Sequence, residues 1–243
     1  MKNKRIALIT GVSREMGLGF ETARQLAALN YEVIITARDI NTATSLADLL
    51  RSNSLQVTPM QLDILNDQSV EKVATAIGEQ WGRLDVLINN AGGYYDADVS
   101  PLEQNFDFAR KAMETNLFGA WRMVKYMVPL LSKSSDGIIV NVSSGAGAFS
   151  DISFGLIAKG DTPAYGLSKL ALNGLTVKLA AELRSRKIKV NAACPGFIAT
   201  YPGTAEWGAR PVAEGAKSIV WAATLPPDGP TGGFYRDGKK LPW

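Results

Sequence analysis

The chain has 243 residues, 46% of them hydrophobic and 20% charged, enough to bury one sizeable core. The net charge of +3 is small and the Lys and Arg residues are scattered, which excludes the basic stripe that nucleic-acid binding requires. The sequence contains no histidine and one cysteine, Cys194, so it excludes His-dependent nucleophile systems, His-ligated metal sites, intramolecular disulfides and thiolate clusters. We therefore expect no metal, and proton transfer must use Tyr, Lys, Asp, Glu, Ser or Cys194.

The first residues, M-K-N-K-R, are basic, but the apolar run behind them, I-A-L-I, is far too short for a signal-peptide core or a membrane span. We expect a soluble, cytoplasmic protein that binds neither a membrane nor nucleic acid.

Short β-branched runs alternate with amphipathic stretches along the chain, which is typical of βαβ units. In chain order we expect strand 5–10, helix 19–29, strand 32–37, helix 42–52, strand 56–62, helix 67–81, strand 86–89, helix 106–131, strand 137–142, helix 163–185, strand 189–193, helix 211–223 and a short strand near 233–235. Runs such as I-A-L-I are apolar on both faces, as expected when helices cover both sides of a sheet. The pattern predicts one doubly wound α/β domain over residues 1–243, with a seven-stranded parallel sheet and ligands outside the carboxyl ends of its strands.

The first strand is followed by T-G-V-S-R-E-M-G-L-G, which places Gly11, Gly17 and Gly19 in the turn before the first helix. Glycines there permit positive φ and let backbone N–H groups approach a pyrophosphate at the helix N-terminus. The literal G-x-G-x-x-G fingerprint is absent, because five residues separate Gly11 from Gly17. Taken alone, the motif is equally well explained as a structural turn; its place after the first strand favours a dinucleotide site.

The second strand ends in T-A-R-D, where the residue type distinguishes between two dinucleotides. An arginine at this place accommodates a 2′-phosphate, so Arg38, with Arg14 of the glycine loop, favours NADP over NAD. Asp39 argues the other way, because it could reach a ribose 2′-OH. Either arginine could also be a solvated loop charge.

Polar residues follow further strands: Asp63, the N-N-A-G turn at 89–92, and Ser143 with Ser144. Asp63 could accept a hydrogen bond from an adenine amino group, and the small N-N-A-G turn leaves room for a cofactor, although a plain turn also explains Asp63. Serines often only cap the next element. Asn116, inside a helical run, is either an exposed position or a kink that turns a carbonyl and a water chain toward an active site.

The stretch T-P-A-Y-G-L-S-K-L places Tyr165 and Lys169 four residues apart on one face of a helix that begins near Pro163. A phenol with an ordinary pKa of about 10 is a poor acid or base at neutral pH, but a nearby cation lowers that pKa. Such a tyrosine can exchange a proton with a substrate oxygen. A Tyr/Lys pair at this spacing is also common on exposed helices, so the surrounding motifs decide between the two interpretations.

In their order, these motifs resemble those of the short-chain dehydrogenase/reductase family, and the resemblance covers essentially all 243 residues. The motifs are T-G…G-L-G at 10–19, Asp63, N-N-A-G at 89–92, Asn116, Ser143–Ser144, Y-G-L-S-K at 165–169 and P-G-F-I-A-T at 195–200. The ending, G-G-F-Y-R-D-G-K-K-L-P-W, is similar to the tail of NADPH-dependent carbonyl reductases in that family. The resemblance implies a Rossmann-type fold and NADPH-dependent reduction of a small ketone or aldehyde to an alcohol.

The resemblance also assigns roles to residues. It implies that Tyr165 is the general acid and that Lys169 lowers its pKa and binds the nicotinamide ribose. Ser144 would hydrogen-bond the substrate carbonyl, and Asn116 would hold a water relay to Lys169. The implied cofactor residues, with Pro195, Gly196 and Thr200 at the carboxamide, are Gly11, Ser13, Arg14, Gly17, Leu18, Gly19, Arg38, Asp63, Ile64, Asn90, Ala91, Gly92, Tyr165, Lys169, Pro195, Gly196, Ile198 and Thr200.

The chain departs from the family pattern in two places. Glu15 and Met16 form an insertion in the glycine loop, which leaves the phosphate contacts and the reach of Arg14 open. Ser144 precedes Tyr165 by 21 residues, more than is usual, and we expect the extra segment within 151–161 to form a loop near the pocket. Longer insertions there obstruct assembly in some carbonyl reductases, so a homo-oligomer stays open.

Four aromatic residues, Tyr94, Phe149, Phe154 and Trp207, are candidate walls of a substrate pocket suited to bulky carbonyl compounds. Each could equally be an ordinary core or surface residue. Two rival functions are reduction of a dedicated metabolite, such as a 3-oxoacyl thioester or a steroid-like ketone, and a non-catalytic NADP-sensing module. A complete Ser, Tyr and Lys set argues against the sensor, because a sensor needs no proton donor.

Overall fold

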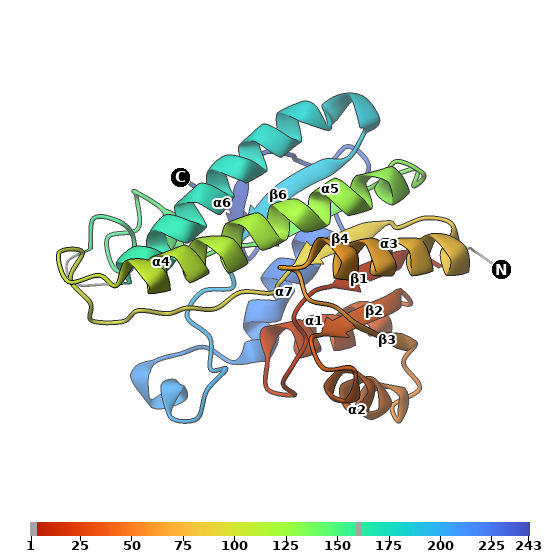
Figure 1. Cartoon of the computed structure of the whole chain (residues 1–243), viewed down its shortest axis with the longest axis horizontal. Helices are drawn as coiled ribbons and strands as arrows, with labels where there is room; N and C mark the ends of the chain where they lie inside the picture. Colours follow the sequence, from red (N-terminus) through yellow and green to blue (C-terminus); the bar gives the residue numbers. More distant parts are fainter. Residues whose placement is uncertain (1–3, 159–161) are drawn as a thin grey trace.

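The computed structural model describes residues 4–158 and 162–243. An eight-stranded sheet, in the order β3-β2-β1-β4-β5-β6-β7-β8, runs through them (Figure 1). Its strands are β1 (Ile6–Ile9), β2 (Glu32–Ala37), β3 (Val57–Gln61), β4 (Val86–Asn89), β5 (Ile138–Val142), β6 (Lys189–Ala193), β7 (Phe234–Arg236) and β8 (Lys239–Leu241). The helices are α1 (Leu18–Ala28), α2 (Ile40–Arg51), α3 (Asp67–Trp81), α4 (Phe106–Met113), α5 (Ala120–Leu131), α6 (Pro163–Glu182) and α7 (Val212–Ala223).

Strands β1 to β7 pair in parallel, as predicted, but the sheet has an eighth strand that the sequence analysis missed. β8 returns antiparallel to β7 through Asp237 and Gly238, whose φ angles are 51° and 74°. Two successive positive φ angles make the tight turn that Asp-Gly favours between antiparallel strands. The D-G pair was therefore a usable hairpin signal in the sequence.

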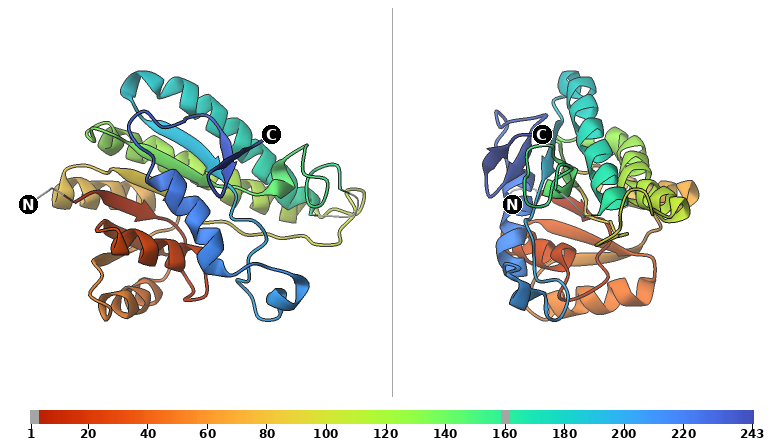
Figure 2. Two further views of the ribbon diagram at one scale, coloured as in Figure 1. Left: turned by 180° about the vertical axis from the view of Figure 1, so that it is seen from behind. Right: turned by 90° about the vertical axis from the view of Figure 1, so that its left-hand side faces the viewer.

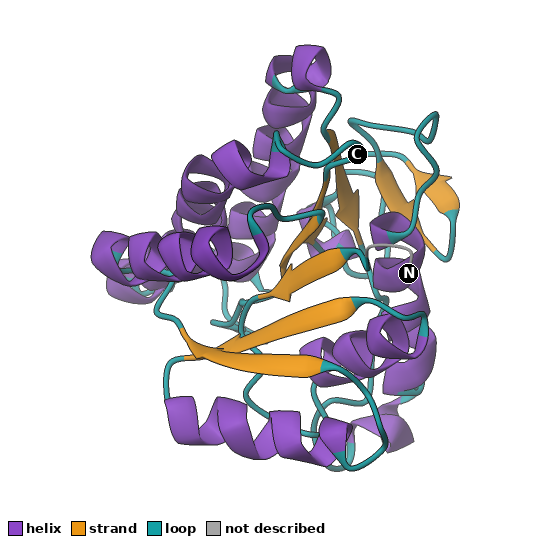
Figure 3. Ribbon diagram, turned by 90° about the vertical axis from the view of Figure 1, so that its right-hand side faces the viewer, coloured by secondary structure: helices purple, strands orange, loops and turns teal. Residues whose placement is uncertain are grey.

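Helices cover both faces of the sheet because its central strands are apolar on both sides. In β1, Ala7 and Ile9 pack into a core with residues of α1, α2 and α7. Ile6 and Leu8 point the other way, into a core with residues of α3, α5 and α6. Figure 3 shows the strands between the two helical layers, and Figure 2 shows the same arrangement from behind and from the side. The predicted doubly wound fold is confirmed.

The predicted helix 106–131 changes its geometry part-way. Between α4 and α5 the chain forms a π-helical segment, Glu114–Gly119, in which each turn holds an extra residue. Asn116 lies in this segment and is only 1% exposed. Of the two interpretations of Asn116, the exposed helix position is therefore wrong.

Short 3₁₀ turns at Gly145–Gly147, Arg184–Arg186 and Thr204–Trp207 complete the described elements. The order of the strands reverses between β1 and β4, which is where a doubly wound sheet opens a crevice at its carboxyl edge. Among the helices that the structure describes, none is long and apolar enough to cross a membrane.

Candidate active site

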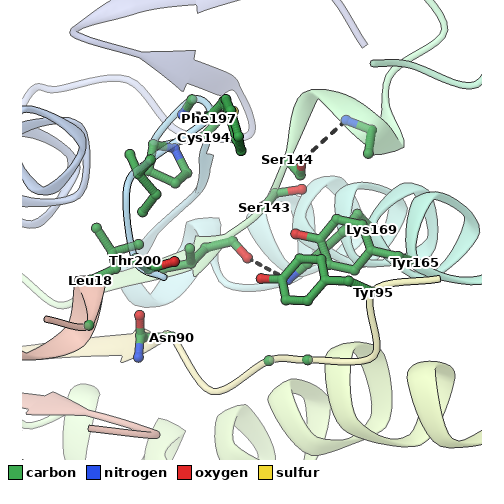
Figure 4. A pocket seen from close by; sticks show the side chains of 18 of the residues that line it. Leu18, Asn90, Tyr95, Ser143, Ser144, Tyr165, Lys169, Cys194, Phe197 and Thr200 are labelled. Atoms are coloured by element: carbon green, nitrogen blue, oxygen red, sulfur yellow. Dashed lines mark hydrogen bonds between the residues drawn. The ribbon is translucent and has the colours of Figure 1, made fainter. Parts of the chain in front are cut away.

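A cavity of about 780 Å³ opens at the carboxyl edge of the sheet, beyond β1, β4, β5 and β6 (Figure 4). Many of the residues singled out in the sequence line it: Gly11, Ser13, Arg14, Gly17, Leu18, Gly19, Asn90, Gly92, Tyr94, Ser144, Phe154, Tyr165, Lys169, Pro195, Gly196, Ile198 and Thr200. Motifs that are far apart in the sequence thus meet around one cavity.

Other predicted residues lie outside this lining: Arg38, Asp63, Ile64, Ala91, Asn116, Phe149 and Trp207. Phe149 and Trp207 are 57% and 75% exposed, so in this structure they form no wall of the cavity. Their part in substrate binding stays a prediction, as does the adenosine contact of Asp63, whose carboxylate accepts a hydrogen bond from the N–H of Leu65. The loop expected within 151–161 includes 159–161, which lie outside the described residues.

The glycine loop forms a close-fitting backbone cradle at one end of the cavity. Gly11 has a φ of 71°, and a Cβ there would lie 2.6 Å from the Cα of Ala91. A Cβ on Gly19 would lie 2.6 Å from the Nδ2 of Asn90, which donates to the carbonyl of Thr10. Helix α1 begins after Gly17, whose lack of a side chain leaves the helix without a side-chain cap from its N-cap residue. Its first N–H groups are therefore available to an anion, so the residues present fit a dinucleotide pyrophosphate.

The Arg14 side chain, which lines the cavity, contacts Thr200 and Tyr201 on the segment that follows β6. Its guanidinium carbon lies 4.2 Å from the centroid of the Tyr201 ring, and its Nη1 donates to the carbonyl of Thr200 at 3.4 Å. The five-residue spacer between Gly11 and Gly17 carries it there. Arg14 thus joins the glycine loop to the segment that follows β6.

The neighbouring residues Arg38 and Asp39 differ in how they are engaged. Asp39 caps α2: its carboxylate accepts from the N–H groups of Asn41 and Thr42 and from the Thr42 hydroxyl. The Thr42 hydroxyl, with the N–H groups, holds the pKa of this exposed carboxyl below its ordinary value. Its acceptor capacity is largely used inside the protein, whereas the side chain of Arg38 extends into solvent.

The two serines after β5 are separated by their hydrogen bonds. Ser143 is 2% exposed, and its hydroxyl donates to Asn173 Oδ1 at 2.6 Å. Ser144 caps the 3₁₀ turn, accepting from the N–H of Ala146 at 3.2 Å, and its side chain, which lines the same cavity, acts to lower the pKa of the Tyr165 phenol. Ser144 is therefore the serine that can meet a ligand beside Tyr165.

Tyr165 and Lys169 lie on consecutive turns of α6 and face the cavity (Figure 4). The Lys169 Nζ donates to the carbonyl of Val142 at 2.9 Å and lies 5.5 Å from the centroid of the Tyr165 ring. The Asp96 carboxylate fixes the start of α6, because it accepts from the backbone N–H groups of Ala164 and Tyr165 at 2.7 and 3.1 Å. Asp96 is thus the anchor of the first turn of α6.

Burial dominates the protonation of this pair. It raises the pKa of the Tyr165 phenol well above its ordinary value, with the Tyr95 phenol adding to the rise and Ser144 opposing it. Burial also lowers the pKa of Lys169 to about 8. The expectation that the pKa of Tyr165 is lowered is therefore not met in the protein alone, because desolvation of the phenolate is the largest influence on it. Tyr165 is a neutral phenol at physiological pH.

Asn116 joins the loop after β4 to α6. Its Oδ1 accepts from the N–H of Gly93 at 3.0 Å, and its Nδ2 donates to the Gly93 carbonyl and to the Ser168 hydroxyl at 3.0 and 2.9 Å. A Cβ on Gly92 would lie 3.1 Å from Asn116 Oδ1 and 3.5 Å from Lys169 Nζ. Asn116 and Lys169 thus converge on one glycine, and a water relay between them stays a prediction.

The sequence analysis missed two residues of this site, Asp96 and Tyr95. The Tyr95 ring lies against the Tyr165 ring, with centroids 4.4 Å apart (Figure 4). Only its neighbour Tyr94 was singled out, and the Y-Y pair was the available signal. Asp96 had no local signal, since its partners lie nearly seventy residues further along the chain.

A sequence model described as short chain dehydrogenase matches residues 5–208. The chain belongs to the short-chain dehydrogenase family. Among its relatives, the short-chain dehydrogenase anuI of Penicillium roqueforti is 37% identical and the alignment covers 91% of this chain and 89% of that protein. Carbonyl reductase (NADPH) 1 of Mus musculus is 31% identical, with 99% of each chain covered.

Solved structures give the same answer for the fold of this short-chain dehydrogenase. The NADPH-bound carbonyl reductase from chicken fatty liver superposes with a TM-score of 0.83 at 26% identity, covering 99% of this chain and 100% of that chain. The protein is an oxidoreductase of a family that binds a nicotinamide cofactor.

Proposed function

We propose that this short-chain dehydrogenase reduces ketones or aldehydes to alcohols with NADPH, and that Tyr165 is the general acid. The observation that carries the proposal is the position of a neutral Tyr165 phenol beside the Ser144 hydroxyl in a cavity whose other end is the glycine cradle. Reduction of a carbonyl by hydride leaves an alkoxide oxygen that must gain a proton, and a neutral phenol can supply it.

Each residue has one task in this reaction. Ser144 donates a hydrogen bond to the substrate carbonyl oxygen, which fixes the carbonyl beside Tyr165. A nicotinamide dinucleotide held against the cradle would supply the hydride for the carbonyl carbon. Tyr165 gives its proton to the carbonyl oxygen, and a proton from solvent would return to the phenolate through Lys169 and a water held by Asn116, since both side chains converge on Gly92. Asp96 keeps the first turn of α6, and thus the phenol, in place.

NADPH is preferred over NADH because Arg38 is free to meet a 2′-phosphate while Asp39 is not free to meet a 2′-hydroxyl. Both oxygens of the Asp39 carboxylate cap α2. The relatives named as NADPH carbonyl reductases support this assignment and the substrate class.

A spectrophotometric assay tests the cofactor and the substrate class together. Oxidation of NADPH and NADH would be followed with aldehydes, aryl ketones, quinones, a 3-oxoacyl thioester and a steroid ketone. We expect turnover of several aldehydes or ketones, with NADPH favoured. Turnover of the thioester or the steroid alone would assign the protein to a dedicated metabolite, and NADH-specific turnover would contradict the role of Arg38.

A further inference from the structure

Four charged side chains line the cavity in the part of the chain that the structure describes: Arg14, Asp151, Lys169 and Arg236. Lys169 takes part in the proposed reaction, and Arg14 joins the glycine loop to Tyr201. Arg236, at the end of β7, has no task in that reaction. A guanidinium stays protonated at any pH of interest, so its charge must be accommodated.

The hydrogen-bonding capacity of Arg236 is poorly used. Its Nη2 lies 3.1 Å from the thiol sulfur of Cys194, which is a weak acceptor. The nearest carboxylate oxygen, Oδ2 of Asp151, is 3.7 Å from the same nitrogen, beyond hydrogen-bonding distance. Within the described residues, Nε is buried and has no partner. Nε itself is closed to solvent, so an incoming acceptor would meet the Nη groups of this side chain, which is 32% exposed and lines the cavity.

A neighbouring arginine, Arg210, forms the close ion pair with a carboxylate that Arg236 lacks. Arg210 donates to Asp237 at 2.8 Å, in direct contact. Asp151 makes no such direct hydrogen bond to Arg236. Its Oδ1 accepts from the N–H groups of Ser153 and Phe154 in its own loop, and its Oδ2 stays 3.7 Å from Arg236 Nη2. Arg236 therefore retains donors that are not matched by a full ion pair.

Arg236 lies close to the residue that follows Ser144. A Cβ on that residue, Gly145, would lie 3.2 Å from Arg236 Nη2 and closer still to Asp151 Oδ2. A second hollow of about 180 Å³ shares Gly145, Asp151 and Arg236 with the main cavity. A ligand group at this corner would therefore meet the guanidinium with space around it.

We propose that Arg236 binds a carboxylate of the substrate, so that the preferred substrates are oxo acids whose carbonyl reaches Ser144 and Tyr165 while the acid group reaches Arg236. This assignment rests on the proposed reduction and specifies its substrate class. A carboxylate is the acceptor that matches the planar fork of an arginine in two parallel hydrogen bonds. Asp151 opposes the anion at short range and limits the affinity.

Matched pairs of aryl oxo acids of increasing chain length and their methyl esters test the proposal, with kcat/KM measured with NADPH for the wild type, Arg236→Met, Arg236→Lys and Asp151→Asn. The quantity compared is the ratio of kcat/KM for the acid to that for its ester. For the acid of fitting length we expect this ratio to fall at least about tenfold in Arg236→Met, as for loss of a charge-assisted hydrogen bond. For Arg236→Lys, which keeps the charge but loses the planar fork, we expect a ratio between those of the wild type and Arg236→Met.

Asp151→Asn gives the opposite change and is the matched control. Asparagine keeps the Oδ1 that accepts from Ser153 and Phe154, but removes the negative charge beside Arg236. We expect the acid-to-ester ratio to rise. Asp151→Asn keeps the loop contacts of Oδ1 and Arg236→Lys keeps the positive charge, so the two variants decide the question even if thermal unfolding shows that Arg236→Met does not fold.

An unchanged acid-to-ester ratio in the Arg236 variants would overturn the proposal. If kcat/KM fell equally for acid and ester, Arg236 would be a structural residue. Failure of the wild type to reduce either compound would instead contradict the proposed function. In that case calorimetric titration of the corresponding hydroxy acid into wild type and Arg236→Lys still decides. Equal affinities would refute the carboxylate site, and weaker binding to the variant would support it.

Discussion

The protonation of Tyr165 is governed by burial more than by the neighbouring lysine. The phenol is 9% exposed and touches Tyr95, so the phenolate loses hydration that a cation on the next helical turn does not replace. The sequence identified the residue and its partner but not this balance, because exposure is set by Tyr95 and by the chain around it. A tyrosine that keeps its proton is suited to reduction, where it acts as an acid.

The pKa of Lys169, lowered to about 8 by burial, predicts a pH dependence that can be measured. The ammonium is present below pH 8 and is lost as pH rises through that value, so attraction for the anionic dinucleotide weakens on the alkaline side. We expect kcat/KM for NADPH, which reports the free enzyme, to fall above about pH 8. Steady-state kinetics over a pH series measures it.

Lys169→Arg is the control, because arginine stays charged across the same range. Its alkaline limb should move to higher pH even if its overall rate is lower. An alkaline limb at the same pH in both proteins would assign the titration to another group.

At the scale of elements, α6 shows most clearly what the sequence could and could not predict. Its start at Pro163 and the common face of Tyr165 and Lys169 follow from local rules, and both are found. Its anchoring by Asp96 could not be predicted, since capping by a residue of a distant loop leaves no local pattern. The π-helical segment around Asn116 was also missed, because one extra residue in a turn hardly disturbs the apolar periodicity.

Removal of the Asp96 carboxylate should loosen the first turn of α6. Asp96→Ala leaves two N–H groups without an acceptor, and we expect the free energy of unfolding to fall by about 0.5–2 kcal/mol, as for loss of an N-cap, and kcat to fall with it. Urea denaturation and initial rates measure the two effects.

Asp96→Asn keeps one acceptor oxygen and should lie between wild type and Asp96→Ala in both measurements. Wild-type stability and wild-type kcat in Asp96→Ala would show that the cap does not position Tyr165.

At the scale of the whole molecule, the cavity is bounded by two parts of the chain that meet through Arg14. The glycine loop follows β1, and Thr200 and Tyr201 belong to the segment between β6 and α7. Part of that segment forms the loop at the lower left of Figure 1. The doubly wound fold could be predicted because alternating strands and helices dictate it. The Arg14 contact could not, because the insertion of Glu15 and Met16 obscured its reach. The single domain over 1–243, the oligomeric state and the cytoplasmic location stay predictions.

Replacement of Tyr201 should weaken the contact between the glycine loop and the segment that follows β6. Tyr201→Leu removes the ring under Arg14, and a cation–π contact at an exposed site contributes about 0.5–1 kcal/mol. We expect NADPH to dissociate about two- to fivefold faster, measured by stopped-flow fluorescence. Tyr201→Phe keeps the ring and should retain the wild-type rate of NADPH dissociation. Equal dissociation rates for Tyr201→Leu and Tyr201→Phe would show that the contact between Arg14 and the ring does not slow NADPH release.

The proposed function requires that the Tyr165 hydroxyl donates the proton in carbonyl reduction. Comparison of wild type with Tyr165→Phe tests this step, with NADPH binding followed by fluorescence titration and ketone reduction by NADPH oxidation. We expect the variant still to bind NADPH while kcat falls by about 10²- to 10⁴-fold, the loss typical of a general acid. Reduction at the wild-type rate by Tyr165→Phe would show that another group is the acid.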